Sequence, residues 1–414
     1  MSIQNLANVR FKGFHHGLPW SNILMWSQVS IEANAKPIRW LWLRPFVHRA
    51  IHIKRKKSTD SQFFGLISAE RKSCVREFDD FCNLDRFDRL YVTHGRLSLD
   101  IIHGLILFFA YIPAWCRVLR KSKISARLKR EILYELIELW YFQKKAEPVC
   151  FERYRLFVSF YDARPLDAFM RELFRLHHVP TVTLQHGQFV AWRENVLENS
   201  GIEFRCFKSD YFLAWNKMTI DEAVKQGVSS EKMTLCGIIS FIGAKTDNWI
   251  FPNNCKFGVV IGHPMYAKEN LELIRSANLL AKERNLKFYL KLHPNYAENF
   301  FDNVVDSAYY LGNIPKGIPM VDYANGVDFS LVGSSSVFAE LVFLRHDVIR
   351  YSNYDIKDKF RDVKIGKIYH TVEEIVAVYD RHKGCNYAEE LFDYVCSVKE
   401  VSTAYRNFLA RFNA

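Results

Sequence analysis

The sequence lacks the short motifs that would assign it to several large enzyme classes. Its 414 residues contain no G-x-x-x-x-G-K-[ST] phosphate loop, no G-x-G-x-x-G fingerprint and no G-x-S-x-G nucleophile elbow. They also lack the H-E-x-x-H spacing of zinc enzymes, and the pairs His15-His16 and His177-His178 are adjacent, so a helix could not turn either pair toward one metal. We therefore expect no metal site and no resident cofactor.

Paired cysteines and long apolar runs are missing as well. The nine cysteines stand singly without a C-x-x-C, which favours reduced thiols in a cytoplasmic protein over a disulfide framework or zinc site. Residues 1–20 have no apolar core, so we expect no signal sequence. The longest apolar run, Ile101–Cys116, is shorter than the roughly 20 residues of a spanning helix and contains His103 and Pro113. We expect it not to cross a membrane.

Positive charge is the main compositional excess. The chain has 57 Lys and Arg against 45 Asp and Glu, a net charge of +12. This balance suggests an anionic partner, either nucleic acid, anionic lipid or a phosphorylated substrate. We expect no nucleic acid partner, because no recognised nucleic-acid-binding motif accompanies the charge.

Two segments of the first 150 residues combine apolar and cationic side chains. Arg39–Lys57 interleaves aromatic residues with cations, and Ile101–Cys116 is followed by seven cations within residues 117–130. Helices at an anionic membrane surface have this pattern, and so do core helices with solvated basic flanks. The first interpretation would place the protein in the cytoplasm, peripherally on the inner face of the plasma membrane.

From residue 150 onward, strand patterns alternate with helix-length segments. We expect strands over residues 155–160, 181–185, 211–215, 257–261, 287–294, 328–332 and 348–351. This alternation predicts βαβ units with parallel sheets. We expect a first domain over residues 1–240, a second over 250–387 and a linker within 238–255.

Polar residues follow three of these strands. They are Gln185-His186-Gly187, Gly262-His263-Pro264 and Lys291-Leu292-His293-Pro294. The carboxyl ends of parallel strands are where open α/β sheets form their sites. Lys291 and His293 alternate onto one face, where a cation and an imidazole can stabilise a diphosphate leaving group. Gly262 would bring backbone N–H groups near the phosphates, although each histidine could instead only bond backbone at its strand end.

The turn Gly333-Ser334-Ser335-Ser336 stands between an expected strand and an expected helix. Glycine allows close approach to a ligand, and hydroxyls with free N–H groups can bind phosphate. Glu340, one turn later, could bond ribose hydroxyls. The alternatives are an ordinary serine N-cap and a solvated glutamate.

The first half of the chain offers two candidate general bases. His186 ends one strand, and Asp162 lies just past the preceding strand. Because neighbouring parallel strands end close together, Asp162 could orient His186, bind acceptor hydroxyls or itself be the base. The structural alternatives are a backbone-bonded histidine and an acid near the start of the helix at Pro165.

These motifs, together with S-D-Y-F-L-A-W-N at 209–216, resemble a known group in their order and spacing. They are similar to the bacterial GT-B glycosyltransferases, α/β enzymes with two Rossmann-like domains facing a central cleft. Within that type they resemble capsule-polysaccharide synthesis proteins, sialyltransferases, Kdo transferases and CDP-glycerol glycerophosphotransferases. The resemblance covers roughly residues 150–380.

The resemblance implies a nucleotide-sugar donor in the second domain and a saccharide or lipid-linked saccharide acceptor in the first. It places His293 and Ser334, Ser335 and Ser336 at the nucleotide and its phosphates, and it favours a cytidine nucleotide such as CMP. The acidic-acidic-Gly motif of some sialyltransferases is absent. The resemblance also implies that the last segment, residues 388–414, crosses back to the first domain as a helix over 388–409.

We therefore expect a metal-independent, inverting glycosyltransferase that builds capsule polysaccharide or lipopolysaccharide. Two alternatives use the same fold. One is a polyol-phosphate transferase of the CDP-glycerol type, and the other is a nucleotide-sugar epimerase or hydrolase, which needs no saccharide acceptor.

Overall fold

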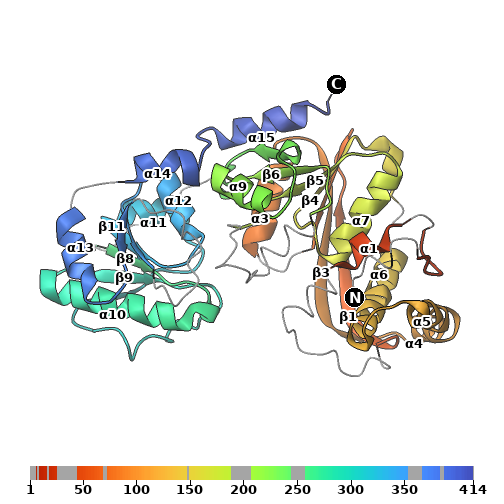
Figure 1. Cartoon of the computed structure of the whole chain (residues 1–414), viewed down its shortest axis with the longest axis horizontal. Coiled ribbons are helices and arrows are strands. Elements are labelled where there is room, and N and C mark those ends of the chain that lie inside the picture. The colour runs from red at the N-terminus through yellow and green to blue at the C-terminus, as the bar shows by residue number, and fades with distance from the viewer. Residues whose placement is uncertain are drawn as a thin grey trace.

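The strands form two separate sheets, one in each half of the chain (Figure 1). The computed structural model describes residues 6, 9–15, 18–25, 44–68, 72–146, 149–187, 207–243, 257–352, 366–382 and 387–413. Most of the expected linker, and residues 39–43 of the first aromatic and basic segment, lie outside these residues.

The first sheet has seven strands in the order β1-β3-β2-β4-β5-β6-β7. Their bounds are Val47–Lys56 (β1), Phe63–Ile67 (β2), Phe87–Leu99 (β3), Leu156–Ser159 (β4), Thr181–Leu184 (β5), Tyr211–Ala214 (β6) and Met233–Leu235 (β7). β1 runs antiparallel to β3, and every other pair is parallel. The strand order reverses between β2 and β4, so the carboxyl ends of these strands flank a crevice suited to ligands.

The second sheet has six strands, all parallel, in the order β10-β9-β8-β11-β12-β13. The bounds are Phe257–Val260 (β8), Phe288–Lys291 (β9), Tyr310–Asn313 (β10), Phe329–Val332 (β11), Val348–Tyr351 (β12) and Lys367–Tyr369 (β13). This is the Rossmann order, and its reversal lies between β8 and β11. Both strands are buried along their whole length, as expected for a sheet covered on two faces.

The α-helices that the structure describes connect and cover these strands. They are Trp20–Ile23 (α1), Lys72–Cys82 (α3), Ile101–Ile106 (α4), Ile112–Lys121 (α5), Ala126–Lys145 (α6), Pro165–Leu176 (α7), Lys217–Lys225 (α9), Ala267–Arg284 (α10), Met320–Gly326 (α11), Val337–Phe343 (α12), Glu374–His382 (α13), Ala388–Val395 (α14) and Val401–Ala410 (α15). A π-helical turn, η3 (Leu107–Tyr111), joins α4 to α5.

The C-terminal segment joins the two halves of the molecule. Helix α14 packs against α12 of the second half and α9 of the first. The Asn216 side chain, at the N-cap of α9, donates to the Val395 carbonyl oxygen at 2.5 Å. Helix α15 then lies along the first half (Figure 1), where the Tyr405 hydroxyl donates to the Gly237 carbonyl oxygen at 3.1 Å.

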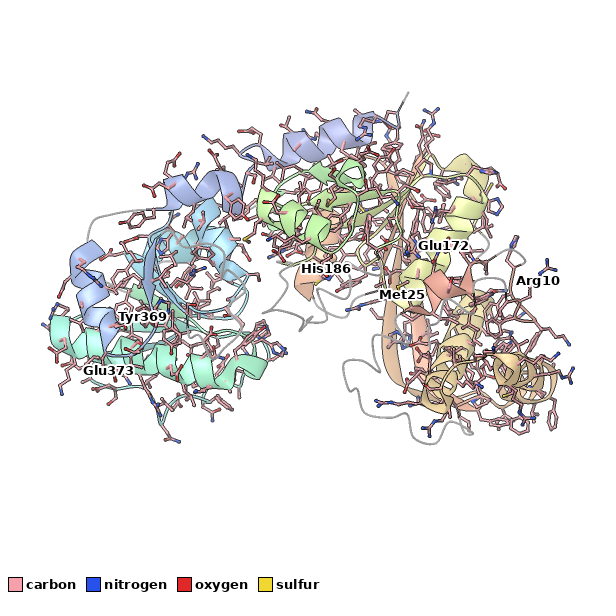
Figure 2. The ribbon with its side chains drawn as sticks, viewed as in Figure 1. Arg10, Met25, Glu172, His186, Tyr369 and Glu373 are labelled. Carbon is pink, nitrogen blue, oxygen red and sulfur yellow. The ribbon has the colours of Figure 1, made fainter. Side chains whose placement is uncertain are left out.

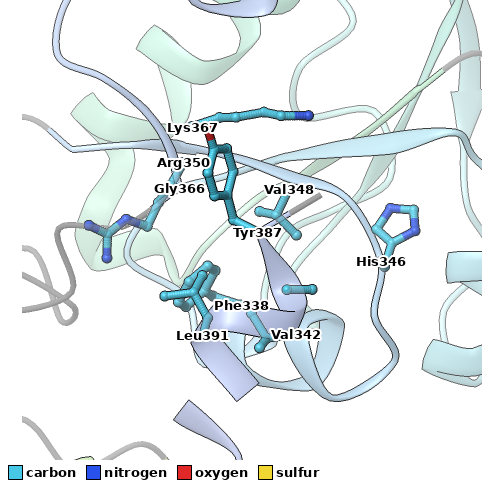
Figure 3. A pocket seen from close by; sticks show the side chains of 10 residues that line it. Phe338, Val342, His346, Val348, Arg350, Gly366, Lys367, Tyr387 and Leu391 are labelled. Atoms are coloured by element: carbon cyan, nitrogen blue, oxygen red, sulfur yellow. The ribbon is translucent and has the colours of Figure 1, made fainter. Parts of the chain in front are cut away.

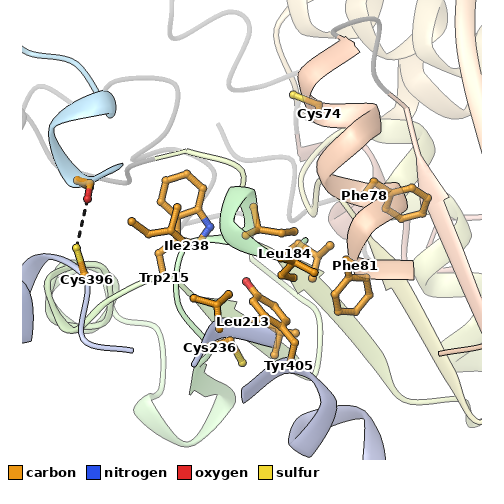
Figure 4. Close-up of a cluster of buried hydrophobic side chains, with 14 of the residues drawn as sticks. Cys74, Phe78, Phe81, Leu184, Leu213, Trp215, Cys236, Ile238, Cys396 and Tyr405 are labelled. Atoms are coloured by element: carbon orange, nitrogen blue, oxygen red, sulfur yellow. Dashed lines mark hydrogen bonds between the residues drawn. The ribbon is translucent and has the colours of Figure 1, made fainter. Parts of the chain in front are cut away.

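One buried apolar cluster spans this junction. Figure 4 shows Phe78 and Phe81 of α3 and Tyr405 of α15 beside side chains that follow β6 and β7. The Cys396 thiol donates to the Ala339 carbonyl oxygen at 3.3 Å, which ties the end of α14 to α12. The rings of Phe241 and Phe343 stack at 3.9 Å across the same junction.

Two expectations about local structure were wrong. The expected single helix over 388–409 is broken between α14 and α15, where Ser397 has a left-handed φ of 66°. Of the expected membrane-surface segment Arg39–Lys57, residues Val47–Lys56 form strand β1 and pair with β3 along most of their length. Its alternating cations therefore follow the two faces of a strand.

Replacing Tyr405, which is fully buried, tests the docking of α15. We expect Tyr405→Ala to lower the free energy of unfolding by about 3–5 kcal/mol, because a large buried ring is lost. Tyr405→Phe should cost about 1 kcal/mol, since it removes only the hydrogen bond to Gly237. Urea unfolding measures both. The control is Phe300→Ala at a side chain that is 58% exposed; equal losses for Tyr405→Ala and Phe300→Ala would contradict this packing.

Candidate functional site

Three parallel strands of the second sheet bring their polar ends to one edge. Val260 of β8 lies opposite Lys291 of β9 on one side and Val332 of β11 on the other. The residues that follow each strand therefore leave the sheet at the same level. This places Gly262-His263, His293-Pro294 and Gly333-Ser334 together at the point where the strand order reverses.

His263 and His293 are in contact there. Their rings meet edge to face with centroids 4.8 Å apart. Asn295 holds both rings, because its side-chain amide lies 3.2 Å from His263 Nε2 and its backbone N–H donates to His293 Nδ1 at 3.2 Å. Since Nδ1 accepts a hydrogen bond, the neutral His293 ring carries its proton on Nε2, which suits donation to a phosphate oxygen. We did not predict Asn295, although it directly follows the K-L-H-P motif.

The serine turn is already in contact with an anion of the protein itself. The Ser334 N–H donates to the Glu269 carboxylate, which comes from the first turn of α10. A side chain at Gly333 would collide with the same carboxylate, so glycine at this position allows the close approach of Glu269 to the turn. The turn can thus bind an anionic oxygen. The Ser335 hydroxyl accepts from the Val337 N–H at 3.3 Å, whereas Ser336, the N-cap residue of α12, makes no side-chain capping hydrogen bond.

The backbone of Gly262 is used differently from our expectation. Its N–H donates to Asn270 Oδ1 at 2.8 Å, and the Asn270 amide donates back to the Gly262 carbonyl oxygen at 3.1 Å. This N–H is therefore used within the protein, and the approach of backbone N–H groups after β8 to a phosphate stays a prediction. Asn270 also donates to the Tyr296 hydroxyl at 3.0 Å, so it fixes the turns after β8 and β9 together.

Lys291 and Glu340 influence each other electrostatically near this edge. Burial lowers the pKa of Lys291, and the charge of Glu340 raises it. Burial raises the pKa of Glu340 to about 7, against the opposing effects of Lys291 and Arg76. A cation held beside a carboxyl that titrates near neutral pH is typical of functional sites. Lys291 Nζ also lies 5.5 Å from the centre of the Tyr323 ring and 3.5 Å from the Ile318 carbonyl oxygen.

Helix α3 of the first half brings two further charges to Glu340. Burial raises the pKa of Glu77 to about 8; Glu340 raises it further, and Arg76 lowers it. Glu77, Arg76, Glu340 and Lys291 are therefore electrostatically coupled although they come from different halves of the chain. Glu77 and Arg76 were not predicted, because nothing in the sequence around α3 marks a site.

On the first sheet, His186 follows β5 and lies against aromatic rings. Its ring centroid is 4.3 Å from that of Tyr161 and 5.6 Å from that of Phe160, both of which follow β4. Figure 2 shows His186 on the side of the first half that faces the second. Gln185 is fully buried and accepts from the Trp215 N–H at 2.6 Å, which fixes the chain just before His186.

Asp162 has a different set of contacts from those expected. Its carboxylate accepts from the Lys208 N–H at 2.5 Å, from the Ser209 N–H at 3.2 Å and from the Ser209 hydroxyl. It also pairs with the buried Arg171 guanidinium at 3.0 Å. No hydrogen bond joins Asp162 to His186 in the part of the chain that the structure describes.

A second acid occupies the crevice between β2 and β4. Asp167, in the first turn of α7, is fully buried and accepts from the Ser68 hydroxyl just after β2. Burial raises the pKa of Asp167 to about 7, whereas Ser68 and Arg164 lower it. Arg164 donates to the Ser68 carbonyl oxygen at 2.9 Å and stacks 3.6 Å from the centre of the Tyr161 ring. These residues were not predicted, since 68 and 167 are far apart in sequence.

A pocket in the second half lies beside α12 and α14 (Figure 3). Its lining includes His346, Arg350 and Lys367. Lys367 pairs with Asp347, and His346 Nε2 lies 2.9 Å from the Ser330 hydroxyl. Burial lowers the pKa of His346 to about 4, so this ring is neutral at physiological pH. The pocket contains none of the predicted site residues. Across the described residues, no three potential metal-ligating side chains gather at one point.

The comparisons with solved structures give the fold. The UDP-GlcNAc 2-epimerase of Neisseria meningitidis, solved with UDP-GlcNAc, is 13% identical with a TM-score of 0.54, covering 84% of this chain and 99% of its own. The S. aureus protein MnaA, solved with UDP, is 11% identical with a TM-score of 0.56, covering 85% and 97%. The epimerase of Methanocaldococcus jannaschii, solved with UDP-GlcNAc and UDP, is 11% identical with a TM-score of 0.53, covering 84% and 99%.

No family model and no curated protein matches the sequence. The structural likeness confirms the predicted fold class: the chain has the GT-B fold, with two Rossmann-like domains.

The coupling of Glu77 to the site predicts a pH-dependent stability. Because the pKa of Glu77 is raised in the folded protein, its stabilising contribution is present below about pH 4.5 and is lost as the pH rises through about 8. We expect Glu77→Gln to raise Tm by about 2 °C or more at pH 9 and by much less at pH 5. Thermal unfolding at both pH values measures this. The matched control is Glu298→Gln at an exposed position; a Glu77→Gln effect that is equal at both pH values would contradict the raised pKa of Glu77.

Proposed function

We propose that the protein is an enzyme that acts on a nucleotide-activated sugar and transfers the glycosyl group to a saccharide or lipid-linked acceptor. The observation that carries this proposal is the meeting of His263, His293, Lys291 and the serine turn at the reversal of strand order in the second sheet. These groups supply a cation, imidazole donors and an anion-binding turn, which together suit a departing nucleotide phosphate.

In this mechanism the acceptor hydroxyl attacks the anomeric carbon, and the bond from that carbon to the nucleotide phosphate breaks. Lys291 and the Nε2 proton of His293 stabilise the negative charge that develops on the phosphate oxygen. An attack from the face opposite the leaving group inverts the anomeric configuration. Glu340 interacts with Lys291 electrostatically. There it can keep Lys291 protonated, or it can accept hydrogen bonds from ribose hydroxyls.

We propose His186 as the group that accepts the acceptor's proton. It follows β5 on the side of the first domain that faces the second (Figure 2). Asp162 is the weaker candidate, because its carboxylate already accepts from Ser209 and pairs with Arg171. A carboxylate in an ion pair is a poorer base than one held alone. We propose that Asp162 fixes the segment before β6.

A second activity on the same site is favoured by the structural neighbours. The Neisseria meningitidis and Methanocaldococcus jannaschii proteins are named as UDP-GlcNAc 2-epimerases and were solved with UDP-GlcNAc. The S. aureus protein MnaA was solved with UDP. The protein would then convert a nucleotide sugar without any acceptor. Incubation of the full chain with UDP-GlcNAc alone, followed by NMR, separates the two activities, because conversion without acceptor favours the epimerase.

Two histidine variants test the proposed chemistry. We expect His293→Ala and His186→Ala each to lower the rate of glycosyl transfer by about a hundredfold, since each removes a proton donor or acceptor at the reacting groups. The control is His178→Asn, because His178 is exposed and has a left-handed φ of 57° that asparagine tolerates. Transfer rates with the accepted donor are measured for all three variants. Full activity in both alanine variants would refute the mechanism.

Nucleotide preference provides a separate test. The motif resemblance favours a cytidine nucleotide, whereas the neighbours above were solved with uridine nucleotides. We expect CMP, CDP or UDP to raise Tm, and we expect Gly333→Ala to abolish that rise, because an added Cβ would lie 1.8 Å from Glu269 Oε1 and 3.1 Å from Leu273 Cδ1, so the turn that presents the serine groups would have to shift. Thermal unfolding with CMP, CDP, UDP and GDP measures both. An unchanged response in Gly333→Ala would place the nucleotide elsewhere.

A further inference from the structure

The first domain carries a ridge of exposed apolar side chains. Helix α4, turn η3 and helix α5 form one helical rod over Ile101–Lys121, and residues 101–116 contain no Asp, Glu, Lys or Arg. The exposed side chains, which we call the apolar ridge, are Leu99, Ile101, Ile102, Leu105, Ile106, Phe108 and Phe109. By its length and composition the rod could cross a membrane. Only 17% of its most apolar stretch is buried inside the protein. The alternative of a core helix is therefore wrong for this segment.

One side of the rod is fixed to the domain. Leu107 and Trp115 are fully buried, and the Trp115 indole N–H donates to the Lys12 carbonyl oxygen at 2.9 Å. Gly104 lies so close to the Phe46 ring that an added Cβ would come within 2.5 Å of it. Crossing a bilayer would break these contacts. A rod with one face held by protein and the other exposed and apolar suits a membrane interface.

A cluster of cations follows the ridge directly. Arg117, Arg120 and Lys121 lie in and at the end of α5, and Lys123 follows; all four are exposed. The two most exposed ridge residues, Ile102 at 73% and Phe109 at 72%, precede this cluster on the same rod. In an anionic bilayer the apolar side chains would contact the acyl chains, and the cations that follow them would contact the lipid headgroups.

We propose that the apolar ridge inserts into the headgroup and acyl boundary of an anionic phospholipid bilayer, with Arg117, Arg120, Lys121 and Lys123 at the lipid phosphates. In Figure 1 the helices α4 and α5 lie at the end of the first domain that is remote from the second. Binding there leaves the junction between the domains accessible. It would also bring the domain assigned to the acceptor close to lipid.

Charge favours a bilayer over a second copy of this chain. A two-fold dimer through the ridge would bring two copies of the cationic cluster toward each other, in a chain whose net charge is already +12. Protein interfaces are also depleted in lysine relative to the rest of the surface. An anionic bilayer satisfies the apolar and the cationic parts of the surface together.

Flotation of the full chain with vesicles tests the proposal. We expect the protein to float with phosphatidylcholine vesicles that contain a quarter phosphatidylglycerol, and to float more weakly with pure phosphatidylcholine. The double variant Ile102→Glu with Phe109→Glu should bind the anionic vesicles at least about tenfold more weakly, because it places carboxylates in the apolar layer. Replacing Arg117, Arg120 and Lys121 by Gln should remove the preference for the anionic vesicles.

The matched control is Phe300→Glu, which charges a side chain that is 58% exposed on the second domain and should bind vesicles like the unaltered chain. Thermal unfolding and the response to nucleotides show that each variant is folded. The proposal is overturned if the unaltered chain fails to float, or if the Ile102→Glu, Phe109→Glu variant floats equally well. It is also overturned if sedimentation shows a dimer that this variant dissociates while no form binds vesicles. These outcomes are independent of whether the site transfers or epimerises a sugar.

Discussion

The pairing of β8 with both β9 and β11 is the constraint on which the site depends. Three parallel strands of four residues each are held in register, so Val260 lies level with Lys291 and Val332. Everything that follows those strands then leaves the sheet at the same edge. The contact between His263 and His293 follows from this register, because side chains cannot meet there if one strand shifts by a residue. The chemistry of the site is thus set by backbone pairing in a buried sheet.

Electrostatic coupling connects this edge to the first domain. Glu77 of α3 lies close enough to Glu340 for the two charges to interact, and desolvation raises the pKa of both carboxyls. Lys291 and Arg76 oppose that effect. A change in the distance between α3 and α12 would change the protonation of both carboxyls. These four side chains therefore connect the two domains electrostatically.

From residue 150 onward the sequence predicted most of the strands that the structure describes, although β7, β10 and β13 were missed, and before residue 150 it predicted none. The short buried strands of this region have clear apolar patterns, and β4, β5, β6, β8, β9, β11 and β12 lie where they were predicted. By contrast, β1 and β3 are long strands with mixed polar and apolar residues, and they were not predicted. The break at Ser397 was missed because a left-handed φ at a serine has no clear sequence signal.

The candidate site was predictable where its residues belong to one motif. His293 and the serine turn follow strands whose ends were recognisable, and the structure brings Asn295 to both histidines. Tertiary packing alone brings Glu77 and Arg76 to Glu340, and Asp167 to Ser68, so no local sequence pattern could identify these residues.

The most direct test of the proposed donor site is a crystal structure of the full chain soaked with UDP and, separately, CMP. We predict phosphate density within hydrogen-bonding distance of the serine turn and of His293. Density confined to the pocket lined by Arg350 and Lys367 would contradict it.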